Sequence, residues 1–269
     1  MLAPNRDAPL PVLVEGTTLD ETYAKLIVRV IDSPGKLITP LTLSIGADNY
    51  DEMLGGQGVL KTALDYAYGI TNRARPKQSH AYSVDTVAFT IFPKRYHDIS
   101  DSTEEFFDLY KRAYPRLKAL NRANSRGLYF ERLTMYGDGV KCGGNQLKWF
   151  IQSYLSRDGV RKSMYQAAIF DPIRDHSNTA RLPFPCLHSL SFLPIGNSLA
   201  LNAFYPTQQI YRKAYGNYLG LINLGNFMAE EMGLTFCRLN VMVGKAELDT
   251  TKGGEILPVL NACRELVEA

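Results

Sequence analysis

A single cysteine is the residue of this chain best suited to covalent chemistry. Cys186 lies in the segment PFPCLH at residues 183–188. Only the ionised thiolate is a good nucleophile, so this chemistry needs a neighbour that ionises the sulfur. His188 comes two residues later, and side chains two apart on a strand face the same side. The pair predicts either a nucleophile assisted by His188, or a small buried cysteine beside a histidine bonded to backbone.

An asparagine follows this cysteine at a distance that the intervening pattern explains. Between Cys186 and Asn217, residues 187–194 and 199–205 alternate like two strands joined by a hairpin turn. An apolar helical stretch then covers residues 217–232. Asn217 is suited to cap that helix. Its amide also offers a donor and an acceptor to the edge of a flat ring.

The spacing of Cys186 and Asn217, with the run FMAEEMGL at residues 227–234, resembles thymidylate synthases and the related pyrimidine-nucleotide hydroxymethylases. The resemblance implies that Cys186 attacks C6 of a pyrimidine-type ring while Asn217 reads the ring edge. A one-carbon unit, hydroxymethyl or methyl, would then pass to C5. The implied donor is 5,10-methylenetetrahydrofolate, and the implied assembly is a homodimer through one face of a sheet.

Other segments extend the resemblance. Tyr129, in RGLYFERL at residues 126–133, is similar to a family tyrosine in the proton-transfer network beside the nucleophile. It is equally suited to a plain core position. Arg161 and Lys162 resemble an arginine pair that reaches across the dimer to the substrate phosphate, although such a pair is also common in solvated loops.

Several positions depart from the family pattern. Pro206 and Thr207 replace an Arg-Ser pair whose arginine holds phosphate and helps to ionise the thiol. Gln209 replaces an aspartate that contacts folate, and Glu247 and Asp249 replace a His-x-Tyr sugar clamp. We therefore expect Thr207, Gln209, Glu247 and Asp249 to contact the substrate. They favour a ligand other than a plain deoxynucleotide monophosphate.

Two classes of function remain open on this pattern. The first is a one-carbon transferase acting on a pyrimidine-type nucleotide, nucleoside or related ring. The second is a non-catalytic relative that keeps the scaffold and serves as a binding or structural subunit, because the family arginine that ionises the cysteine is absent.

The order of elements predicts one α+β domain over residues 13–269 after an extended arm over residues 1–12. We expect a large twisted sheet, mostly antiparallel or mixed, with helices packed on one face. The patterns predict helices at 18–30, 58–68, 103–121, 145–155, 217–232 and 255–267, and a turn at 50–55. They predict strands at 37–45, 84–92, 128–135, 164–170, 187–194, 199–205 and 236–243.

Composition limits the classes of protein and the cellular compartments to which the chain can belong. The chain has 269 residues, 45% of them apolar, and a net charge of +3 without a basic block, which argues against nucleic-acid binding. No apolar run reaches the length of a membrane span, and no secretory signal is visible. The four cysteines show no disulfide or metal-ligand spacing, which favours reduced thiols in the cytoplasm and no bound metal.

Overall fold

The computed structural model describes residues 11–55, 58–74, 81–137, 139–156, 160–176, 178, 186–250 and 253–268. Most of the expected arm, residues 1–10, lies outside these ranges. The strands are β1 (Val12–Gly16), β2 (Leu37–Ile38), β3 (Leu41–Gly46), β4 (Gln166–Ala168), β5 (Ser189–Ile195), β6 (Ser198–Gln209) and β7 (Thr235–Glu247). The helices are α1 (Leu19–Asp32), α2 (Tyr50–Leu54), α3 (Val59–Ala74), α4 (Val84–Ile91), α5 (Lys94–Asp98), α6 (Thr103–Leu120), α7 (Tyr129–Thr134), α8 (Gln146–Ser156), α9 (Pro172–Asp175), α10 (Tyr215–Glu231) and α11 (Gly253–Glu268). A π-helical turn, η5 (Ile210–Ala214), joins β6 to α10.

The strands form one open, mixed sheet in the order β1-β3-β7-β6-β5-β4, with β2 also paired to β7. β1 runs parallel to β3, and β6 runs parallel to β7. The remaining pairs are antiparallel. The expected α+β class with a mixed sheet is confirmed. The expected hairpin is also present, because β5 and β6 pair from Ser189–Phe204 to Ile195–Ser198.

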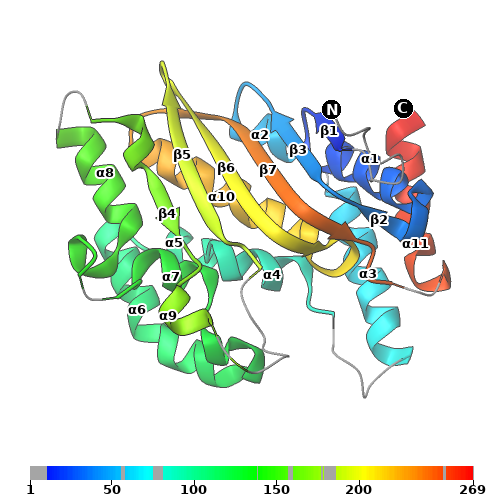
Figure 1. The fold of residues 1–269 in the computed structure, drawn as a ribbon, viewed down its shortest axis with the longest axis horizontal. Coiled ribbons are helices and arrows are strands. Elements are labelled where there is room, and N and C mark those ends of the chain that lie inside the picture. Colours follow the sequence, from blue (N-terminus) through cyan, green and yellow to red (C-terminus); the bar gives the residue numbers. More distant parts are fainter. Residues whose placement is uncertain are drawn as a thin grey trace, which may run out of the picture.

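One face of the sheet is buried against helices and the other is not. Leu239, Val241 and Val243 of β7 are fully buried, whereas Met242 between them is 51% exposed. In Figure 1, β5, β6 and β7 pass in front of α10, and no described helix crosses the near side of these strands. Because side chains alternate along a strand, each central strand gives one row to the core and one to the uncovered face.

The uncovered face carries an aligned row of polar side chains, one from each strand of the main path. Ser44 Oγ donates to Asn240 Oδ1 at 2.8 Å, and Asn240 Nδ2 donates to Asn202 Oδ1 at 2.8 Å. At the far edge Gln166 Nε2 donates to Ser191 Oγ at 2.9 Å. The side chains thus bond laterally across the strands. In register the row is Glu15, Ser44, Asn240, Asn202, Ser191 and Gln166.

The strand expected at residues 84–92 is wrong, because this segment is helix α4. Ser83 caps the helix by accepting from Thr86 N at 3.2 Å, and the buried residues recur with helical spacing. α4 lies against two glycines of α10. A Cβ on Gly216 would come 2.7 Å from Val87 Cβ, and one on Gly220 would come 2.7 Å from Ala88 O. This close helix contact outweighs the β propensity of the valines and threonines.

The strand expected at residues 128–135 is also wrong. It forms α7, in which Phe130–Thr134 are all buried, so no amphipathic period was visible in the sequence. The turn expected at 50–55 is instead α2. Asn49 caps it by accepting from Glu52 N at 2.9 Å, and Gly55 ends it with a φ of 71°. Of the strand expected at 164–170, only β4 forms.

The strand expected at 37–45 is divided into β2 and β3, which pair with different parts of β7. The remaining expected helices and strands are present with shifted ends. α10 begins at Tyr215, preceded by η5, so Asn217 lies inside the helix and does not cap it. β7 continues to Glu247, beyond the expected end at residue 243. The early start of α10 and the longer β7 bear on the candidate site, because several of its residues lie at or just after the ends of β6 and β7.

Candidate functional site

Cys186 lies directly before β5 and is held through its backbone. The Tyr129 hydroxyl at the start of α7 accepts a hydrogen bond from Cys186 N at 3.1 Å and a longer one from Leu187 N at 3.5 Å. Leu187 is fully buried and Cys186 is half-buried. Burial raises the pKa of the Tyr129 hydroxyl well above its ordinary value, and the nearby Cys186 raises it further. Tyr129 therefore remains a neutral hydroxyl beside the cysteine.

The end of β6 brings a hydroxyl to the sulfur. The Thr207 side chain, which is exposed, acts on the Cys186 thiol and favours its ionised form. Burial raises the pKa of the Cys186 thiol above its ordinary value, while Thr207 and the Lys213 ammonium lower it. Burial dominates, so the thiol is predominantly protonated at neutral pH.

The π-helical turn η5 directs two consecutive basic residues to different partners. Arg212 Nε lies 3.6 Å from Asp249 Oδ2 in a largely buried ion pair. Lys213 instead lies with its ammonium 4.8 Å from the ring centroid of Tyr82, and its charge acts on Cys186. Burial lowers the pKa of Lys213, against the influence of Asp249 and Cys186. Lys213 is thus a cation whose charge favours the ionised form of the Cys186 thiol.

Buried polar groups surround this part of β6 and α10. The fully buried Tyr205 interacts electrostatically with both Tyr129 and Cys186. Its hydroxyl has no hydrogen-bond partner among the described residues. Tyr218 OH donates to Gln208 Oε1 at 2.6 Å, whereas Gln208 Nε2 is buried without a partner in the described part of the chain. Unpaired buried donors of this kind require water or a ligand group.

Asn217 lies on α10 next to this polar region. It is 4% exposed, and its amide makes no hydrogen bond with the described residues. An amide side chain offers donors and an acceptor that suit a ring edge. The arrangement is compatible with the expected ring contact.

Among the described residues, His188 makes no side-chain contact with Cys186. Its ring stacks on Phe170, with centroids 5.1 Å apart and planes at 13°, and meets the edge of Phe204 at 5.6 Å. Its Nδ1 is buried without a hydrogen-bond partner in the same residues. The surroundings are those of an aromatic packing residue.

The other expected substrate contacts are spread over the molecule. Asp249 accepts from Tyr211 N at 2.8 Å and Arg212 N at 3.3 Å, so it caps η5. Glu247 is exposed and pairs with Lys245 at 2.8 Å.

Gln209 is exposed at the end of β6, opposite Glu247 in the sheet register. Arg161 and Lys162 are exposed just before β4, at the far edge of the sheet, and form no ion pair with the described residues.

Sequence reasoning missed Lys213 and Tyr82 as members of the site. Lys213 lies between the strand expected at 199–205 and the helix expected at 217–232, where no element was expected, and the structure forms the π turn there. Tyr82 follows a segment without periodicity, so no pattern marked it. A basic residue within one turn of the expected Asn217 was the available signal for Lys213.

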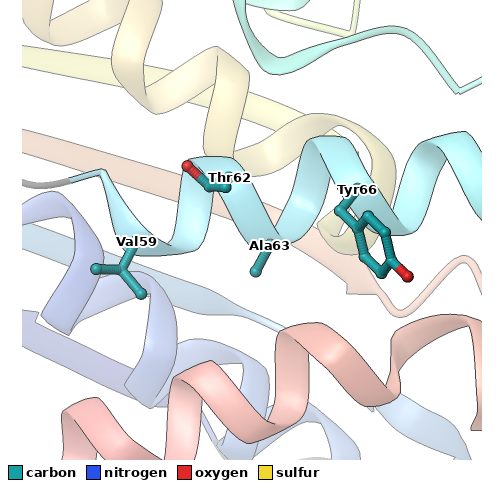
Figure 2. A pocket seen from close by; sticks show the side chains of 4 residues that line it. All are labelled: Val59, Thr62, Ala63 and Tyr66. Atoms are coloured by element: carbon teal, nitrogen blue, oxygen red, sulfur yellow. The ribbon is translucent and has the colours of Figure 1, made fainter.

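Two surface hollows lie away from Cys186. The first, of about 480 Å³, is lined by Val59, Thr62, Ala63 and Tyr66. Figure 2 shows these side chains along α3, with α11 running beside it. The second, of about 400 Å³, lies between α6 and the segment that leads into α8. Neither contains a residue of the candidate site.

No family model matches the chain. No curated protein matches it at a significant level. Among the residues that the structure describes, no helix is both long and apolar enough to cross a membrane. Within the same residues, no three His, Cys, Asp or Glu side chains gather as metal ligands would.

Proposed function

We propose that the chain is a thymidylate-synthase-like one-carbon transferase in which Cys186 adds to C6 of a pyrimidine-type nucleotide, nucleoside or related ring. The observation that carries the proposal is the hydrogen bond from Cys186 N to the Tyr129 hydroxyl at 3.1 Å, together with Thr207 and Lys213, which lower the pKa of the thiol against burial. Both favour the thiolate, which the addition needs. A flat ligand that displaces water from the site would strengthen both interactions.

The residues present can support a balanced reaction. The thiolate forms the S–C6 bond, and the electron pair of the C5–C6 double bond moves to C5. C5 would then bond the electrophilic carbon of a one-carbon donor, while the electron pair of that carbon's bond to the donor would move to the donor's leaving group. C5 would lose its proton to a base. Elimination restores the double bond and the thiolate. Asn217 would orient the ring by its edge, and the neutral Tyr129 hydroxyl beside the Cys186 backbone would take part in proton transfer.

The proposed donor is 5,10-methylenetetrahydrofolate. Its support is the sequence resemblance alone, because Gln209, at the position of the family's folate contact, lies exposed and hydrogen-bonds no described residue. We therefore assign no residue to the donor. The sequence pattern alone favoured a substrate other than a plain deoxynucleotide monophosphate. The Lys213 ammonium adds a positive charge that favours a substrate with an anionic group.

A second candidate function is favoured by one specific observation. Burial raises the pKa of Cys186 more than Thr207 and Lys213 lower it. A protonated thiol suits a binding or structural subunit that has kept the scaffold and lost the chemistry.

Hydrogen exchange at C5 separates the two functions without a donor, since reversible thiolate addition at C6 labilises the C5 proton. Uridine and cytidine nucleosides and their monophosphates would be incubated with the protein in deuterium oxide and analysed by mass spectrometry. We expect deuterium at C5 with the wild type and with Cys237→Ala, a half-buried cysteine of β7. We expect none with Cys186→Ala, which should still bind the ligand.

Exchange that persists in Cys186→Ala would refute the nucleophile. Ligand binding without exchange in the wild type would favour the binding subunit.

A further inference from the structure

The short helix α7 carries a fully buried charge three residues after Tyr129. The Arg132 and Asp175 side chains are both 0% exposed and form a bidentate ion pair. Arg132 also donates to Ile169 O at 2.9 Å and to Arg126 O at 2.8 Å. Asp175 accepts in addition from Asp171 N at 2.8 Å. Such a paired and hydrogen-bonded buried charge fixes its partners firmly, since separating them leaves a charge without solvent.

The neighbouring residues repeat the connection between α7 and α9. Arg174 donates to Glu131 Oε1 at 3.1 Å, and Arg126 donates to Arg174 O at 3.1 Å. Gln146 of α8 holds α7 from the other side, because its Nε2 donates to Arg132 O at 3.0 Å. The position and direction of α7 are therefore fixed by side chains from both α8 and α9.

Asp175 is the last residue of α9, and Cys186 follows it later in the same stretch of sequence. α7 binds both ends of this stretch: Arg132 binds Asp175, and the Tyr129 hydroxyl binds Cys186 N. We propose that Arg132 is a positioning residue, which by its ion pair with Asp175 fixes α7 and so, through Tyr129, holds the Cys186 backbone in the place that the proposed reaction requires. The inference rests on the proposed function for its catalytic meaning, and on the geometry alone for the mechanical connection.

The test is Asp175→Asn, which keeps the size and an acceptor but removes the charge that pairs with Arg132. Amide hydrogen exchange and the pH dependence of Cys186 alkylation by iodoacetamide would be measured on the folded protein. We expect exchange at Cys186 and Leu187 to be about tenfold faster. We also expect the alkylation midpoint to move down toward that of an ordinary thiol, because a displaced Cys186 is less buried.

The matched control is Asp85→Asn, which breaks the exposed pair with Lys61 at 2.9 Å and should change neither measurement. If Asp175→Asn does not fold, the double variant Arg132→Met/Asp175→Leu removes both charges at similar volume and gives the same two measurements. Unchanged exchange and alkylation at Cys186 in a folded variant would overturn the proposal. A wild type without C5 exchange would refute the proposed chemistry and leave these two measurements valid.

Discussion

The Tyr129 hydroxyl accepts a hydrogen bond from the backbone N–H of Cys186 at 3.1 Å. Helix α7 thereby holds the main chain of the candidate nucleophile in place. The sulfur is left to other groups, namely Thr207 and Lys213. Position and ionisation of the cysteine therefore depend on different residues, and substitutions can separate them.

Tyr129→Phe removes the acceptor for Cys186 N and Leu187 N. We expect the free energy of unfolding to fall by about 1–3 kcal/mol, because buried donors lose their partner. C5 exchange should fall as well, because the thiol is less well placed. Urea denaturation and the exchange assay measure the two effects. Tyr136→Phe is the control, since its hydroxyl donates to Phe170 O at 3.1 Å away from the site. Equal loss of exchange in both variants would argue against a special role for Tyr129.

Lys213→Met should raise the pKa of Cys186 further, because the cation that favours the thiolate is gone. At a fixed pH below that pKa, the rate of Cys186 alkylation should fall several-fold, because less of the thiol is ionised. Lys245→Met removes an exposed lysine that pairs with Glu247 and should leave the rate unchanged. A pH profile of Lys213→Met that overlays the wild type would place Lys213 outside the site.

Glu131 gives a pH dependence of stability with a defined sign. Burial raises its pKa, against the influence of Arg174 and Arg132. Between the ordinary and the raised value the folded state binds the proton and the unfolded state does not, so falling pH stabilises the fold in this window. Glu131→Gln cannot titrate and should lose this gain when unfolding is measured as the pH falls from neutral toward the ordinary pKa of a glutamate, about 4.3. The exposed Glu104→Gln should keep it, and a wild-type slope in Glu131→Gln would assign the effect elsewhere.

The uncovered sheet face predicts a homodimer, as the sequence resemblance implied. Met242 is 51% exposed at its centre, and Leu13 is 61% exposed on β1. Met242→Asp should convert the dimer to a monomer in sedimentation at micromolar concentration, because it places a charge in a closing interface. Ile173→Asp on α9 changes an even more exposed residue and should have no effect. A monomeric wild type would exclude this assembly.

Elements that bury one face and expose the other were predictable, because their apolar residues recur with a regular period in the sequence. The hairpin of β5 and β6 and the helices α1, α3, α6 and α8 each alternate between core and solvent. α4 and α7 were not predictable, because their environments decide them. The glycines of α10 admit α4, and α7 is buried on nearly every side. Local propensity carries no record of such tertiary contacts.

The candidate site divides in the same way. Cys186, Tyr129 and Thr207 were expected from the family resemblance. The Tyr129 hydroxyl lies against the Cys186 backbone, and Thr207 lowers the pKa of the thiol. Lys213 was not found, and Asp249 lies instead in a cap and ion pair with Arg212. Both results depend on how the backbone turns after β6, which residue types do not reveal.

Because of the turn η5, the number of residues between β6 and α10 decides which way the Lys213 side chain points. A π turn holds one residue more than the α-helical turn that would replace it, and each residue rotates a helix by about 100°. Deleting one residue between Ile210 and Ala214 would leave α10 in place, yet it would turn the Lys213 side chain to another direction. A relative with every site residue conserved and this turn one residue shorter would therefore lack the cation beside its cysteine. Counting residues from Cys186 to Asn217 is thus as informative as identifying them.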